Sequence, residues 1–76
     1  MESDKEQIRF GSRAIFRGYA TLNQIQQTLA EQVRDDVNGK PHRPIGMILR
    51  ERGWITAEQE HSILEEMIGE TQRKQG

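Results

Sequence analysis

The residues best suited to chemistry are two glycines, an arginine and a glutamine that could together bind an anion. Gly11 and Gly46 stand at the start of two short predicted helices, where free backbone amides and the helix dipole attract negative charge. Arg9 comes just before Gly11 and can present a forked guanidinium, and Gln32 can add an amide that both donates and accepts. The pattern therefore predicts a candidate anion site. The other interpretation of the glycines, a tight helix crossing, stays open.

Patterns for catalysis or metal binding are weak. His61 and Glu65 are one helical turn apart and could share a metal, but no third ligand accompanies them. His42 is predicted to be a solvated loop residue, and Asp35 and Asp36 to serve a helix end or turn. There is no cysteine, the serines lack the neighbours of a nucleophile, and no phosphate-cradling glycine loop is present. We therefore expect no enzyme activity, no cofactor and no metal site.

The candidate residues belong to a segment that occurs twice in the chain. Residues 9–32 and 44–67 align at an offset of 35, with Phe10 over Ile45 and Tyr19 over Trp54. Seven of the 24 aligned positions are identical: Gly11/Gly46, Arg17/Arg52, Gly18/Gly53, Thr21/Thr56, Gln24/Gln59, Leu29/Leu64 and Glu31/Glu66. This similarity indicates an internal repeat.

Helix start and stop signals divide each repeat into a short helix and a long helix. Gly18 and Gly53 suit left-handed C-terminal caps, and Thr21 and Thr56 each open a capping box. Apolar residues recur at helical spacing, and no useful alternation of the β type appears. The sequence predicts an all-α fold of four helices, built as two tandem helix-turn-helix repeats that pack about a pseudo-twofold axis or a simple translation. The predicted helices cover about 10–17, 22–34, 45–52 and 57–70.

We expect one domain over residues 1–76. Repeat one covers 9–32, the linker with its two prolines covers 33–43, and repeat two covers 44–67, with flexible ends at 1–7 and 71–76. The acidic start lacks the features of a secretory signal, and no apolar run reaches membrane-spanning length. These features predict a cytoplasmic protein that does not insert into membranes.

Two asymmetries break the repeat. Ile25 aligns with Glu60, so the second long helix lacks one apolar residue, and we expect His61 and Ile63 to cover part of that gap. Residues 8–34 and 40–52 are net basic, whereas residues 53–70 contain five glutamates and no lysine or arginine. The charge pattern predicts a molecule with a basic side and an acidic side.

The repeat resembles the tandem motif in the N-terminal domain of type II secretion and type IV pilus assembly ATPases. The matching positions in repeat one are Arg9, Phe10, Gly11, Ala14, Gly18, Ile25, Leu29 and Gln32. The resemblance implies a helical, non-catalytic bacterial domain, here as a stand-alone copy, that docks on a protein partner or binds cyclic di-GMP. In repeat two, Pro44 and Met67 replace the motif's arginine and glutamine, Arg43 lies one residue out of register, and the spacer 33–43 is long.

The favoured hypothesis is a protein-interaction or adaptor module with an unidentified protein partner. Phe16 and the glutamine-rich face of the first long helix are candidate contacts. The alternative is a cyclic di-GMP receptor that uses Arg9, Phe10, Gly11, Gln32, Ile45 and Gly46. A DNA-binding helix-turn-helix is a remote third possibility, because the net charge is −1 and the last helix is acidic.

Overall fold

Four helices make up the fold in the computed structural model, which describes the backbone of residues 2–75 and the side chains of residues 5–70. They are α1 (Glu2–Phe16), α2 (Leu22–Val37), α3 (Ile45–Glu51) and α4 (Ala57–Gln75). No strand occurs within residues 2–75, so the predicted all-α class is confirmed. None of the helices described is long and apolar enough to span a membrane.

The helix bounds agree with the prediction to within one residue except at the two outer ends and at the end of α2, which continues from the predicted residue 34 to Val37, into the predicted linker 33–43. α1 begins at Glu2 rather than near Phe10, so residues 2–7, expected to be a flexible lead, are helical. α4 continues to Gln75, beyond the predicted end at residue 70. Met1 and Gly76, which were also assigned to flexible ends, lie outside the described residues. The correction at α1 matters because the added turns bring Glu6 and Gln7 to the site described below.

The turn from short to long helix is built identically in the two repeats. Gly18 and Gly53 both have φ +78°, the left-handed conformation in which glycine ends a helix without a steric penalty. The residue after each glycine closes the helix end with a hydrogen bond. The amide of Tyr19 donates to the carbonyl of Ala14, and the amide of Trp54 donates to the carbonyl of Leu49, both at 2.9 Å. Capping boxes follow: Thr21 with Gln24 and Thr56 with Gln59, each with reciprocal bonds of 3.0–3.1 Å. These cues were all readable in the sequence.

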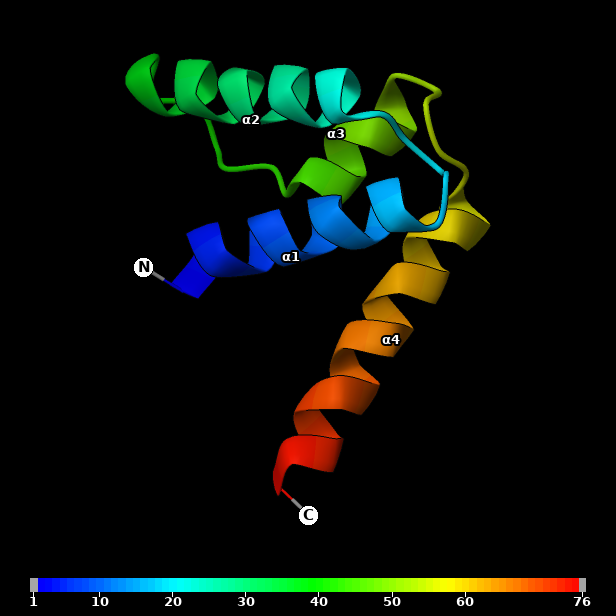
Figure 1. The fold of residues 1–76 in the computed structure, drawn as a ribbon. Coiled ribbons are helices and arrows are strands. Elements are labelled where there is room, and N and C mark those ends of the chain that lie inside the picture. Colours follow the sequence, from blue (N-terminus) through cyan, green and yellow to red (C-terminus); the bar gives the residue numbers. More distant parts are fainter. Residues whose placement is uncertain (1, 76) are drawn as a thin grey trace.

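The short helix α3 is the centre of the packing and contacts each of the other three helices. In Figure 1 it lies between α1 and α2, whereas α4 leaves the others and extends away toward its C-terminal end. The core is aliphatic with one aromatic ring, and Tyr19, Leu29, Trp54 and Met67 pack around it. Its buried members are Phe10, Ala14, Ala20, Ile25, Ile45, Leu49, Ile55 and Ile63.

Contacts between the repeats recur with the repeats exchanged, as a pseudo-twofold arrangement would give. Arg17 of repeat one binds Glu66 of repeat two, and the equivalent Arg52 binds Glu31. At the level of helices, α1 packs on α4 and α3 packs on α2. A simple translation does not exchange the two repeats, so it would not produce such reciprocal contacts. The first helix of each repeat therefore packs on the second helix of the other repeat.

Candidate functional site

Four of the six predicted site residues meet where α1 and α3 cross. A β-carbon built on Gly11 would lie 2.9 Å from Ile25 Cγ2 and 3.4 Å from Ile45 Cδ1. One built on Gly46 would lie 2.8 Å from Phe10 Cζ. Phe10, Gly11, Ile45 and Gly46 are all buried. These contacts agree with the interpretation that the glycines permit a tight helix crossing, since a side chain at either position would push the helices apart.

Arg9 lies at the edge of this crossing and binds a carboxylate of the protein itself. Its Nη2 is 3.3 Å from Glu70 Oε1, and Arg13 also donates to Glu70. Hydrogen bonding by Arg13, and secondarily by Arg9, holds the pKa of Glu70 below its usual value. The guanidinium that was predicted to attract an anion is therefore already balanced by α4.

The same is true of the whole arginine stripe on α1. Arg13 and Arg17 both pair with Glu66, and Arg17 also donates to Ser62 Oγ at 3.4 Å. The pKa of Arg17 is raised, first by its hydrogen bond with Tyr19 and then by Glu66. The expectation of separate basic and acidic sides is wrong here, because the basic stripe of α1 and the acidic stripe of α4 face each other.

Gln32, the sixth predicted residue, helps to hold the start of α3. Its Nε2 donates to the carbonyl of Arg43 at 2.8 Å and to Gln7 Oε1 at 3.2 Å. Gln7 Oε1 also accepts from the backbone amide of Ile45 at 2.7 Å, which satisfies a free amide in the first turn of α3. Gln32 thus reaches the α1–α3 crossing, but as a structural link.

Arg43, one residue out of register in the sequence, occupies a position like that of Arg9 and Arg13. It binds Glu31, Asp35 and Glu51 at 2.8–2.9 Å. Glu31 and Asp35 of α2 align with Glu66 and Glu70 of α4 in the repeat. The hydrogen bonds that Arg43 donates, first to Asp35 and then to Glu31, raise the pKa of Arg43, while Arg52 and then Arg43 lower the pKa of Glu31. Both arginine clusters are therefore structural clamps between the repeats.

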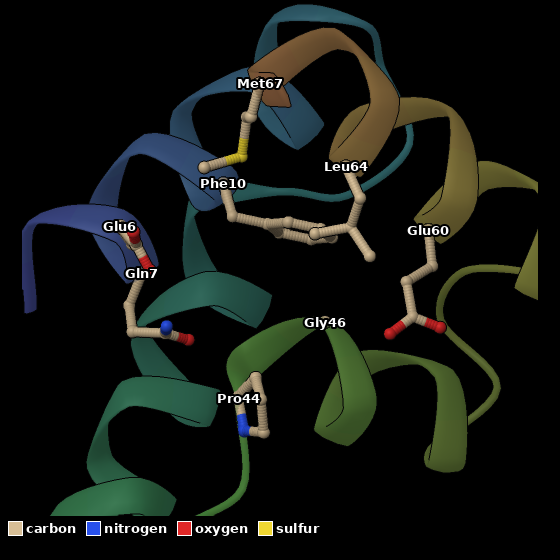
Figure 2. A pocket seen from close by; sticks show the side chains of 8 residues that line it. All are labelled: Glu6, Gln7, Phe10, Pro44, Gly46, Glu60, Leu64 and Met67. Carbon is tan, nitrogen blue, oxygen red and sulfur yellow. The ribbon is translucent and has the colours of Figure 1, made fainter. Parts of the chain in front are cut away.

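A pocket of about 220 Å³ opens beside the crossing, between α1, α3 and α4 (Figure 2). We call it the Glu60 pocket, and it is lined by Glu6, Gln7, Phe10, Pro44, Gly46, Glu60, Leu64 and Met67. Only Phe10 and Gly46 among these were predicted as site residues. For Glu60 the sequence held a signal, because the repeat has a glutamate there in place of the apolar Ile25.

Contrary to expectation, His61 does not cover the gap. It is exposed and pairs with Glu65, its Nε2 lying 3.0 Å from Glu65 Oε2. Ile63 is fully buried, but in the core at the position equivalent to Thr28. Glu60 itself faces the space and is tolerated because its Oε1 accepts from Arg50 Nε at 2.6 Å. In repeat one the equivalents of this ion pair are Ile15 and Ile25.

The remaining candidates do not form a reactive site. No group of three metal-ligating side chains comes together within residues 5–70. Asp35 is buried and held by Arg43, and its carbonyl accepts from Lys40 in the turn that follows α2. His42 is exposed. Phe16, the predicted contact residue, is 92% exposed, which makes it the most exposed large apolar side chain described.

Comparisons of the chain with protein-family models, with curated proteins and with solved structures found no match.

Proposed function

We propose that this domain is a non-catalytic protein-interaction module, similar in role to the N-terminal domains of secretion and pilus ATPases that its repeat resembles. The observation that carries the proposal is the Glu60 pocket and the apolar edge beside it. Leu64 on its wall is 43% exposed, and Ile68, one turn further along α4, is 58% exposed. An apolar pocket continuous with exposed apolar side chains is typical of a surface that another protein covers. A cytoplasmic role in a bacterium is part of the same proposal.

The size of the pocket also favours a protein side chain over a large ligand. Pockets for drug-sized molecules have volumes of about 300–1,000 Å³, whereas this one has about 220 Å³. A single anchoring side chain suits such a space. Anchors of this kind, inserted into a small pocket and surrounded by weaker contacts, dominate many protein interfaces.

The test is site-specific photocrosslinking in cells that naturally make the protein. A photoreactive amino acid at position 68 lies beside the pocket, and one at the exposed position 40 serves as the control. We expect one discrete crosslinked species from position 68, identified by mass spectrometry and absent from position 40. The proposal fails if position 68 gives no product, or only the product pattern that position 40 also gives.

Cyclic di-GMP binding is the second candidate, because the residues of the resemblance do meet around the α1–α3 crossing. Gly11 contacts Ile45, Gly46 contacts Phe10, and Gln32 holds the start of α3. Against it, the ligand would have to displace Glu70 from Arg9 and approach the carboxylates of Glu6 and Glu60. A titration of the ¹⁵N-labelled protein with cyclic di-GMP, with GTP as control, decides the matter. Saturable shifts at Arg9–Gly11 and Ile45–Gly46 support this candidate, and a flat titration removes it.

DNA binding is disfavoured by the pairing of the basic residues. Within residues 5–70, only Lys5, Arg34 and Lys40 are lysines or arginines with no carboxylate partner. The other cations already have local counter-charges, so they offer little counterion release to a phosphate backbone.

A further inference from the structure

Much of the lining of the Glu60 pocket is apolar. The ring of Phe10 and the side chain of Leu64 face the space, with Met67 above and Pro44 below in the view of Figure 2. Gly46 contributes only backbone to the lining. These surfaces suit the hydrocarbon part of a guest.

The charged groups of the lining are all carboxylates. Glu60 Oε1 accepts from Arg50, but no hydrogen bond from the side chains of residues 5–70 reaches Glu60 Oε2. That oxygen lies 3.3 Å from the position of a β-carbon on Gly46, and the Glu60 carboxylate points into the space beside Gly46 (Figure 2). Glu6, on another wall, has no ion-pair partner in the same part of the chain. Since the Glu60 side chain is only 19% exposed, a donor brought to Oε2 would be shielded from water.

The other repeat shows that the fold does not need this opening. The residue equivalent to Glu60 is Ile25, which packs against Gly11 and is 5% exposed. Repeat two therefore has a carboxylate beside a pocket at the position where repeat one has a buried isoleucine. The carboxylate at this position belongs to one repeat only.

We propose that the Glu60 pocket receives an arginine side chain of the partner protein, an inference that rests on the proposed function. The methylene stem of the arginine packs between Phe10 and Leu64, and its guanidinium donates to Glu60 Oε2. Arginine fits better than lysine because its planar head stacks on an aromatic ring, is more weakly hydrated and binds carboxylates with a forked geometry. Charge complementarity thus selects a basic guest with a long apolar stem.

The first measurement is an NMR titration of the ¹⁵N-labelled protein with n-butylguanidinium, which reproduces the arginine side chain. n-Butylurea, of nearly the same shape but uncharged, is the control ligand, and n-butylammonium represents lysine. We expect saturable shifts at the amides of Phe10, Gly46 and Leu64, with at least fivefold weaker binding of the urea and weaker binding of the ammonium. Equal responses to guanidinium and urea, or shifts that do not saturate, overturn the proposal.

Two variants test the assignment to Glu60. Glu60→Gln keeps the shape and should weaken n-butylguanidinium binding at least fivefold, whereas Glu58→Gln, at an exposed position of the same helix, should leave it unchanged. Glu60→Ile should abolish binding while the spectrum remains that of a folded protein. Equal losses in both Gln variants would mean a diffuse attraction to an acidic helix, which contradicts the pocket.

The photocrosslinking experiment distinguishes failure of the proposed protein-interaction function from failure of the proposed arginine guest. A position-68 crosslink without butylguanidinium binding leaves the protein-interaction function standing and removes the arginine guest. Butylguanidinium binding without a crosslink supports the pocket chemistry and removes the proposed function.

Discussion

The ring of Phe10 occupies the space that any side chain at Gly46 would need. The distance from Phe10 Cζ to a β-carbon at position 46 would be 2.8 Å, and from Cε2 it would be 3.1 Å. Both residues are buried, Phe10 on α1 and Gly46 on α3, so this contact sets how closely the two helices can approach. Substitutions at this crossing should therefore be sharply position-dependent.

The first prediction concerns two glycines with opposite surroundings. Gly46→Ala should lower the free energy of unfolding by about 1–3 kcal/mol, because overpacking forces α1 and α3 apart. Gly69 lies within α4 with nothing inside 4 Å of its β-carbon position. Gly69→Ala should therefore raise stability by about 0.5–1 kcal/mol through helix propensity. Urea denaturation measures both, and the same sign for the two variants would contradict the packing argument.

The second prediction concerns the difference between the repeats. Glu60→Ile should fill the Glu60 pocket as Ile25 fills its equivalent, and should raise the free energy of unfolding by about 1 kcal/mol. The reverse change, Ile25→Glu, should lower it by about 3–5 kcal/mol, since it buries a charge with no partner. Glu60 is paired with Arg50, but the residue equivalent to Arg50 in repeat one is Ile15, which cannot pair with a glutamate at position 25. Thermal and urea unfolding check both, and a destabilising Glu60→Ile would show that the pocket is not empty space.

The third prediction concerns the clamp at Arg43. Arg43→Met should destabilise the domain, because it leaves the buried carboxylate of Asp35 without its counter-charge. Arg34→Met makes the same substitution at an arginine that has no carboxylate partner among residues 5–70, so it is the matched control. We expect the control to stay within about 0.5 kcal/mol of the parent. Similar urea midpoints for the two variants would mean that the Arg43 cluster contributes nothing.

The fourth prediction concerns acid. The pKa of Glu31 is lowered, chiefly by Arg52 and then by Arg43. A carboxylate with a lowered folded-state pKa stabilises the fold above its unfolded-state pKa of about 4.3, and this stability is lost as the pH falls through the folded value. The free energy of unfolding should be flat near neutral pH and should fall below about pH 4.5. Glu31→Gln should flatten that fall, whereas Glu58→Gln should not. A pH profile that is the same for both variants would contradict the assignment.

Much of the fold could be predicted because its cues are local. Gly18, Gly53, Thr21 and Thr56 fix the turns through backbone conformation and short-range hydrogen bonds, which depend only on neighbouring residues. The start of α1 at Glu2 could not be read in the same way. Residues 2–7 contain no apolar residue, and Gln7 gains its role only by reaching the amide of Ile45 across the molecule.

The site was harder to predict because its character depends on which residues become partners. Arg9 has the sequence position of an anion ligand, but its charge is balanced by Glu70, 61 residues away. The pocket had one usable signal, the change from Ile25 to Glu60. The accompanying change from Ile15 to Arg50 would have identified the partner of Glu60 in advance. Nothing in the spacing showed that Glu6 and Pro44 would border the same space.

The exchange of partners between repeats has a consequence for the halves of the chain. Because α1 needs α4 and α3 needs α2, a peptide with one repeat would have to find a second copy to cover its apolar face. Joining the two copies through the residue 33–43 segment replaces that bimolecular encounter by an intramolecular one, with an effective concentration of about millimolar. Once joined, the copies no longer had to be identical. They differ at one such position, where the first repeat has the buried Ile25 and the second has Glu60 beside a pocket.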